Sequence, residues 1–336
     1  MKAVGYRQPH PIDNPAALED LELPAPLPGE RDLLVRVKAI SVNPVDTKVR
    51  KNAAPEPGQP RVLGWDAVGS VEAIGASVKN FKVGDRVYYA GSITRPGANA
   101  ELHAVDERIV ALAPKTLDDA QAAALPLTTI TAYELLFDRL KVPKNGGAGQ
   151  TLLVVGGAGG VGSILLQLAR QLTQLRVVAT ASRPTTRQWC LDLGAHAVID
   201  HSKPLAAELK AAGFGEVDMV ASLTQTDRHY AQIIESLKPQ GQLAVIDDMP
   251  VLDAMPLKTK CISLHWELMF TRSRFETPDI ARQGELLAEV AGLVDAGRIR
   301  TTANAAFGTI NAQNLRRAHA LIESGTAQGK VVLQGF

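Results

Sequence analysis

The hydrophobic pattern of the chain changes near Pro126. Before this residue, short β-like runs alternate with turns that are rich in proline and glycine. The clearest runs span 32–41, 67–75 and 85–91, and the connectors include PAPLPGE, AAPEPGQP and VKNFKVGD. Short runs bounded by such turn signals are typical of strands. We therefore predict an all-β region over residues 1–125, folded as a small barrel or sandwich.

After Pro126, apolar strands alternate with amphipathic helices. Helical spacing covers 131–142, and TLLVVGGAGGVGSILLQLARQL (151–172) gives a buried strand, a glycine turn and a helix. Further strands are predicted at 176–182, 197–200, 217–223, 241–248 and 261–270, and further helices at 185–194 and 230–240. This alternation with short loops predicts a parallel sheet that is covered on both faces. Right-handed crossovers then make the sheet doubly wound.

The C-terminal part of the chain mixes helices and strands. The pattern predicts a helix at 279–297, a β-like piece in TTANAAFG, a helix at 311–325 and a closing strand at 329–333. We therefore expect an α/β protein of two domains. One is a β-rich domain formed by residues 1–126 and 273–336, and the other is a doubly wound domain formed by residues 127–272.

The composition excludes several classes of protein. A chain of 336 residues with 46% hydrophobic content can bury two sizeable cores. The 36 basic and 35 acidic residues leave a net charge of +1, so we expect no nucleic acid or anionic membrane as a partner. No apolar run reaches the length of about 18 residues that a membrane span needs. The two cysteines, Cys190 and Cys261, exclude a disulfide framework and favour reduced thiols in a cytoplasmic protein.

The glycine turn is the strongest functional motif. It has the form G-x-G-x-x-G, made by Gly157, Ala158, Gly159, Gly160, Val161 and Gly162. A buried strand precedes it and a helix follows it, which is the context of a dinucleotide-binding turn. Glycines let the backbone approach a pyrophosphate, and the helix N-terminus supplies unpaired N–H groups. The alternative interpretation is an ordinary tight turn.

The end of the next strand bears on the choice of cofactor. An acidic side chain there would bind the ribose 2′-OH of NAD, but the sequence ATASRP contains none. Ser182 offers a hydroxyl, and Arg183 and Arg187 offer guanidinium groups that suit a 2′-phosphate. The sequence therefore favours NADPH over NADH. The alternative is that both arginines are solvated surface charges.

Short motifs extend over essentially the whole chain. They are VNPVD (42–46), GWDAVGSVEAIG (64–75), FKVGDRV (81–87), AAALPLTTITAYELL (122–136), GGAGGVG (156–162), LGAHAVID (193–200) and GKVVL (329–333). Together they resemble the medium-chain dehydrogenase/reductase superfamily, and within it the quinone-oxidoreductase-like branch and the zinc-type alcohol dehydrogenase-like proteins. The resemblance implies a GroES-like β domain, closed by the C-terminal segment, and a Rossmann domain with a nicotinamide in the cleft. It also implies a homodimer or homotetramer.

The resemblance places three zinc ligands on segments that lack them here. Asn43 stands where zinc members have cysteine, and Trp65 stands where they have histidine. The third cysteine has no counterpart near Leu125, Pro126 and Leu127. A catalytic zinc needs three protein ligands, so we expect no metal.

Without a Lewis acid, an acceptor that takes hydride readily is favoured, such as a quinone. We assign Asn43 as a candidate hydrogen-bond donor to the acceptor, Asp46 as its orienting group and Trp65 as a flat wall for stacking. The alternatives are a turn residue for Asn43, a helix cap for Asp46 and core packing for Trp65.

The remaining candidates line the pocket or the cofactor. Candidates for the substrate pocket are Thr47, Lys48, Tyr88 and Tyr89, and candidates for cofactor contacts are Thr131, Leu223, Met269, Phe270 and Lys330. A solvated lysine is the alternative for Lys330. Three functions stay open: an NADPH-dependent quinone reductase, an NADPH-dependent reductase of α,β-unsaturated aldehydes or ketones, and a non-catalytic NADPH-binding protein.

Overall fold

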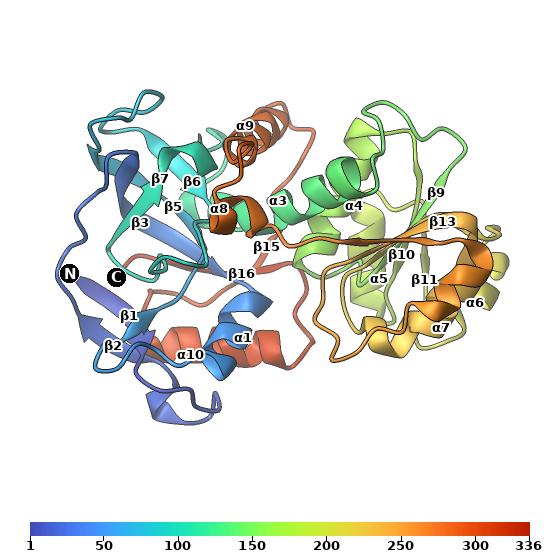
Figure 1. The fold of residues 1–336 in the computed structure, drawn as a ribbon, viewed down its shortest axis with the longest axis horizontal. Coiled ribbons are helices and arrows are strands. Elements are labelled where there is room, and N and C mark those ends of the chain that lie inside the picture. Colours follow the sequence, from blue (N-terminus) through green and yellow to red (C-terminus); the bar gives the residue numbers. More distant parts are fainter. The chain divides into compact units, whose positions relative to one another are not determined.

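The computed structural model describes residues 1–336, and the chain divides into two compact units. Unit 1 comprises Met1–Ile130 and Phe270–Phe336, and unit 2 comprises Thr131–Met269 (Figure 1). The predicted domain boundaries were 126/127 and 272/273. The protein is an α/β protein with a GroES-like β domain and a parallel-sheet Rossmann domain, as the sequence predicted.

Unit 1 is built on a seven-stranded sheet. Six of its strands follow the order β15-β16-β3-β5-β6-β8, and β7 pairs with β3 outside this order. Its strands are β3 (Asp32–Val42), β5 (Asp66–Ile74), β6 (Arg86–Tyr89), β7 (Leu102–Asp106), β8 (Val110–Leu112), β15 (Ala303–Ala306) and β16 (Lys330–Gln334). A second, three-stranded sheet contains β1 (Lys2–Tyr6), β2 (Glu19–Glu22) and β4 (Arg61–Val62). The C-terminal strand β16 runs antiparallel to β3 with Val331 opposite Val42, so the end of the chain completes this unit.

The N-terminal region is not all-β, which corrects the prediction. It contains α1 (Pro44–Asn52), α2 (Asp119–Ala123) and two single-turn 3₁₀ helices (Pro15–Ala17, Glu107–Ile109). Helix α1 begins after the extended residue Asn43, with Pro44 in its first turn and Asp46 in a capping box. The later helices of unit 1 are α8 (Thr271–Phe275), α9 (Arg282–Asp295) and α10 (Ala312–Glu323).

Unit 2 contains a six-stranded parallel sheet with the order β11-β10-β9-β12-β13-β14. Its strands are β9 (Thr151–Val155), β10 (Arg176–Thr180), β11 (Ala197–Ile199), β12 (Val217–Ser222), β13 (Leu237–Val245) and β14 (Ser263–Trp266). Its helices are α4 (Gly160–Leu172), α5 (Pro184–Asp192), α6 (Leu205–Ala211) and α7 (Thr226–Ser236). A 3₁₀ helix spans Met255–Lys260, and Figure 1 shows the helices beside the strands of this sheet.

Three details of unit 2 differ from the prediction. Strand β13 starts at Leu237, so residues 237–240 are not helical, and β14 covers only Ser263–Trp266. The predicted helix at 131–142 is the end of α3 (Pro126–Tyr133) followed by a π-helix (Glu134–Arg139). Both cysteines are free thiols, and no helix is long and apolar enough to cross a membrane.

Candidate functional site

Segments that are far apart in the sequence meet at the buried carboxylate of Asp66 in unit 1. Its Oδ2 accepts hydrogen bonds from Ser41 Oγ (2.6 Å), Asn43 Nδ2 (2.7 Å) and Lys330 Nζ (3.0 Å). Its Oδ1 accepts the backbone N–H of Leu127 at 2.7 Å. Asp66 is 0% exposed, so four donors replace the water that an ionised carboxylate would otherwise need.

Lys330 is buried, which corrects the alternative of a solvated lysine. Only 2% of the residue is exposed. Besides Asp66, its ammonium donates to the carbonyl of Val42 at 3.1 Å and to Oδ1 of Asn43. An ammonium has three N–H donors, and each has an acceptor here. The Asn43 amide is therefore held at both ends, with its oxygen on Lys330 and its nitrogen on Asp66.

Asp46 contacts backbone rather than the side chain of Asn43. Its carboxylate accepts the backbone N–H of Asn43 at 2.6 Å and that of Gly64 at 3.1 Å. Burial raises the pKa of Asp46 to about 7, while the hydrogen bond from Asn43 and the Lys330 charge oppose that rise. Asp46 thus caps α1 and ties it to the segment that precedes Trp65.

The aromatic candidates are buried, with their polar tips bound inside unit 1. Trp65 is 1% exposed, donates its indole N–H to the Ser92 carbonyl at 3.0 Å and meets Phe270 edge-on at 5.9 Å. Tyr88 donates to the Leu287 carbonyl at 2.6 Å. Tyr89 stacks on His103, with 5.5 Å between the ring centroids.

The pocket candidates on α1 differ in exposure. Thr47 is buried and donates to the Pro44 carbonyl at 2.8 Å, whereas Lys48 is exposed. The Thr47 hydroxyl thus serves the first turn of its own helix.

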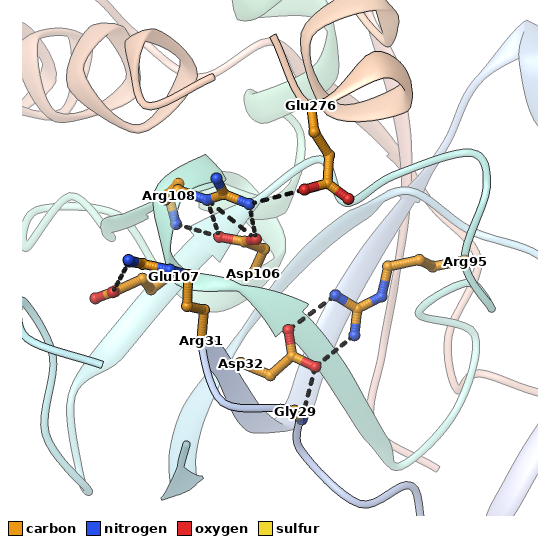
Figure 2. A network of polar contacts seen from close by, with 8 residues as sticks. All are labelled: Gly29, Arg31, Asp32, Arg95, Asp106, Glu107, Arg108 and Glu276. Carbon is orange, nitrogen blue, oxygen red and sulfur yellow. Dashed lines mark hydrogen bonds and ion pairs between the residues drawn. The ribbon is translucent and has the colours of Figure 1, made fainter. Parts of the chain in front are cut away.

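Charged side chains hold the loop that follows β6. Arg95 donates to both carboxylate oxygens of Asp32, at 2.8 and 2.7 Å, and Gly29 N–H adds a bond of 2.9 Å (Figure 2). Burial opposes ionisation, but the bonds from Arg95 and Gly29 hold the pKa of Asp32 below its usual value. Figure 2 also shows Arg108 between Asp106 and Glu276. The sequence does not predict the contacts of Arg95 with Asp32 and of Arg108 with Glu276, because these partners lie 63 and 168 residues apart.

The glycines of the turn in unit 2 differ in the space around them. Gly156 has a φ of +85°, and a Cβ on Gly162 would lie 2.5 Å from the carbonyl oxygens of Gly156 and Gly157. Gly159 is the N-cap of α4, and a Cβ there would meet only the Gly156 oxygen, at 3.5 Å. The turn therefore needs glycine for its own packing at Gly162, whereas a Cβ would fit at Gly159. This geometry fits a dinucleotide pyrophosphate at a helix N-terminus.

The turn between β10 and α5 carries the side chains expected at a 2′-phosphate. Ser182 and Arg183 are exposed, and Arg183 is the N-cap of α5. The guanidinium of Arg187 points inward and donates to the carbonyls of Ala181 (3.2 Å) and Val198 (2.8 Å). Arg187 is thus not simply solvated, because it fixes the backbone just before Ser182.

The other cofactor candidates lie near the ends of strands or in α3. Leu223 directly follows β12, and its N–H donates to the Val155 carbonyl at 3.2 Å. Met269 lies shortly after β14 and is 3% exposed. Thr131 is buried in α3, and Phe270 is buried in unit 1. Carboxyl ends of parallel strands are where ligands bind in such sheets.

Comparisons with known proteins match both units. The alcohol dehydrogenase GroES-like domain model matches residues 29–115, and the zinc-binding dehydrogenase model matches residues 193–333. A zinc-type alcohol dehydrogenase-like protein of Staphylococcus aureus is 40% identical over 99% of both chains. The chain belongs to the medium-chain dehydrogenase/reductase superfamily.

Further members of this superfamily differ in the activity that their names state. A crystal structure from Rhizobium etli, described as a zinc-dependent alcohol dehydrogenase protein, is 58% identical, with a TM-score of 0.96 over 100% of this chain and 98% of that one. The quinone oxidoreductase of Pseudomonas aeruginosa is 31% identical over 95% of this chain and 96% of its own.

Two more relatives have descriptions that name an activity or a bound cofactor. The 2-methylene-furan-3-one reductase of Solanum lycopersicum is 31% identical over 90% of this chain and 72% of its own. The Escherichia coli quinone oxidoreductase complexed with NADPH is 25% identical, with a TM-score of 0.84 over 99% of this chain and 100% of that one. This chain is therefore an oxidoreductase of the superfamily.

The side chains of this dehydrogenase/reductase do not fit a zinc ion. No group of three or more His, Cys, Asp or Glu side chains lies close enough together to hold a metal. At the segments where the resemblance places zinc ligands, an amide (Asn43), an indole (Trp65) and the backbone N–H of Leu127 stand instead. Zinc prefers thiolate, imidazole and carboxylate ligands. The single carboxylate there, Asp66, is already bonded to four donors.

Proposed function

We propose that the protein is a zinc-independent oxidoreductase that transfers hydride from NADPH to a quinone. The observation that carries the proposal is the glycine turn at the start of α4, followed by the acid-free turn with Ser182 and Arg183. The identities with quinone oxidoreductases support the choice of acceptor. A quinone yields an aromatic hydroquinone and therefore needs no metal to polarise it.

In this proposal unit 2 binds the cofactor. The N–H groups around Gly159 bind the pyrophosphate, and Ser182 and Arg183 bind the 2′-phosphate. Met269, Leu223 and Thr131 contact the nicotinamide half. When bound, NADPH supplies the hydride, and the chain binds it, orients it and excludes water.

On the acceptor side we assign Asn43 as the donor to the quinone oxygen. Its amide nitrogen carries two N–H groups, and one is donated to Asp66. The second is the group that we assign to the acceptor. Lys330 and Asp66 would then fix the direction of that N–H, while Trp65, which is 1% exposed, packs in the core of unit 1.

A reductase of α,β-unsaturated ketones is the second candidate, because of the resemblance to the 2-methylene-furan-3-one reductase. The experiment measures NADPH oxidation with a panel of quinones and a panel of enones. Quinone turnover well above enone turnover supports the first proposal. Fast enone turnover without quinone turnover replaces it by the second, and NADPH binding without any turnover favours a non-catalytic NADPH-binding protein.

We further propose that the protein acts as a homodimer or homotetramer in the cytoplasm. Strand β14 is the last strand of its sheet, and the apolar side chains Trp266 and Leu268 at its end are 52% and 50% exposed. Apolar groups of that size on a sheet edge are typical of association surfaces. Free thiols agree with a reducing compartment. Measuring the mass of the protein in solution by light scattering tests the assembly.

A further inference from the structure

The loop between β12 and α7 has a strained backbone at the carboxyl edge of the parallel sheet. It comprises residues 223–225, and Gln225 has a φ of +50° and a ψ of 38°, in the left-handed region. A non-glycine residue is strained there, and such strain persists only where the surroundings fix it. Thr224 and Gln225 are exposed, so the core of unit 2 does not hold them. The loop must therefore be fixed at its two ends.

A chain of three polar side chains connects both ends of this loop. Ser222, the last residue of β12, and Thr226, the first residue of α7, are 0% exposed, and their hydroxyl oxygens lie 2.7 Å apart. Asp247 lies two residues after β13, and its carboxylate accepts the Thr226 backbone N–H at 2.9 Å and the Thr226 hydroxyl. A carboxylate only accepts hydrogen bonds. Ser222 therefore donates to Thr226, and Thr226 donates to Asp247.

Asp247 also occupies the N-terminus of α7. A negative charge is favourable at that end of a helix, and the bond from the Thr226 N–H satisfies one unpaired donor of the first turn. Helix α4 differs, because its N-cap is Gly159 and no side chain caps it. Of these two helix N-termini, that of α4 is therefore the one left for a phosphate group. The carboxylate of Asp247 acts on the loop instead.

The loop packs directly on the glycine turn. Leu223 donates its N–H to the carbonyl of Val155, the residue before Gly156, at 3.2 Å. A Cβ on Gly156 would lie 2.9 Å from Cγ2 of Thr224 and 3.7 Å from Cβ of Leu223. The methyl group of Thr224 therefore rests against the backbone of Gly156. The conformation of the loop thus sets the position of Leu223 beside the glycine turn.

We propose that Asp247 is a positioning residue for cofactor binding. Through Thr226 it holds the loop 223–225 against the glycine turn in its strained conformation. The inference rests on the proposed NADPH function, in which Leu223 contacts the nicotinamide half of the cofactor. Without the carboxylate, the loop relaxes to an unstrained backbone and Leu223 leaves its position. If only about a tenth of the molecules then keep the competent loop, the apparent Kd for NADPH rises about tenfold.

The adenosine half of the cofactor provides an internal comparison. In the proposed function Ser182 and Arg183, which follow β10, bind the 2′-phosphate. Strands β10 and β12 flank β9 on opposite sides, so these two residues lie away from the loop 223–225. The fragment 2′,5′-ADP carries the 2′-phosphate and lacks the nicotinamide half. Loss of the anchor should therefore weaken the binding of NADPH alone, whereas a general loosening of unit 2 would weaken the binding of both ligands.

The experiment measures both dissociation constants by isothermal titration calorimetry. Asp247→Ala should raise the Kd of NADPH about tenfold and keep that of 2′,5′-ADP within about twofold of wild type. Thr226→Val loses the hydroxyl and should also weaken NADPH binding, whereas Thr226→Ser keeps the hydroxyl and should bind as wild type does. Asp227→Ala is the control, because Asp227 is an exposed acidic residue in the same turn of α7. It should leave both constants unchanged.

Two calorimetric results would overturn the positioning role and leave the proposed function standing. One is an unchanged NADPH Kd in Asp247→Ala, and the other is an equal loss of affinity for NADPH and 2′,5′-ADP. Absence of NADPH binding by wild type would overturn the proposed function and the positioning role together. Amide hydrogen exchange without nucleotide then still tests the anchor itself. The Leu223 N–H should exchange about tenfold faster in Asp247→Ala than in Asp227→Ala, and equal rates would show that Asp247 does not hold the loop.

Discussion

Replacing Lys330 by methionine should destabilise unit 1 more than the same replacement of an exposed lysine. Methionine has a similar length and no charge, so it removes the ammonium and keeps most of the volume. Asp66, which is 0% exposed, keeps Ser41, Asn43 and Leu127 as donors but loses its counter-charge. The Val42 carbonyl and the Asn43 side-chain oxygen also lose the donor that Lys330 supplied.

The size of the effect follows from this inventory. Removing one partner of a buried ion pair costs about 3–5 kcal/mol of unfolding free energy, because the other charge stays buried. We therefore expect a loss of about 3 kcal/mol or more for Lys330→Met. Asp66→Asn in the same chain removes the stranded charge. The double variant should thus be more stable than the sum of the two single changes by roughly 1 kcal/mol or more.

The assay needs a probe that reports unit 1 alone, because the protein has two units and its unfolding need not be two-state. Trp65 is buried in unit 1, and the other two tryptophans, Trp189 and Trp266, lie in unit 2. Trp65 fluorescence in a Trp189→Phe/Trp266→Phe background, followed through urea unfolding, isolates the relevant transition. Lys82→Met is the control, because Lys82 is exposed on unit 1. It should change stability by less than about 0.5 kcal/mol.

Two results would refute the reasoning. One is a Lys330→Met variant as stable as the Lys82→Met control, which would mean that the ammonium contributes nothing to unit 1. The other is strict additivity of Lys330→Met and Asp66→Asn, which would mean that the two charges do not interact.

Three further predictions concern other parts of the chain. Gly159→Ala should fold normally and raise the NADPH Kd by about tenfold or more. Gly162→Ala should lower the melting temperature, because its Cβ would lie 2.5 Å from two carbonyl oxygens. Equal melting temperatures of the two variants would contradict this prediction. Arg183→Ala should raise the Michaelis constant for NADPH roughly tenfold, since a charge-assisted bond contributes about 1.5–3 kcal/mol, and an unchanged constant would remove Arg183 from the site. Burial, with the charges of Arg50 and Lys51, lowers the pKa of His319 from 6.5 to about 3. Between these values the unfolded state binds one proton more than the folded state, so stability is lost as pH falls from 6.5 towards 3. Relative to wild type, His319→Leu should therefore gain about 1.4 kcal/mol of unfolding free energy for each unit by which the pH falls, and a stability difference that stays constant with pH would refute the assignment.

Local signals predicted the parts of the fold and site that depend on neighbours in the sequence. The glycine turn could be identified because β9, the turn and α4 are contiguous and the spacing of the glycines reflects backbone contact. The capping box of α1 was also present in the sequence as Asn43, Pro44 and Asp46. The β-like pattern on both sides of it favours strands, which is why the N-terminal region is predicted as all-β.

Long-range pairing accounts for what the sequence could not predict. Lys330 and Asp66 are 264 residues apart, and only the pairing of β16 with β3 and of β3 with β5 brings them together. Asp66 lies beside Trp65 in the motif, but the sequence does not indicate its role, because the fold alone determines which donors reach its carboxylate.

The central proposal is that hydride transfer proceeds without zinc. The most direct test measures quinone-dependent NADPH oxidation by the protein before and after treatment with a strong chelator, with the zinc content of both samples determined. We predict unchanged turnover and no stoichiometric zinc in either sample. Turnover that is lost on chelation and restored by added zinc would contradict the account.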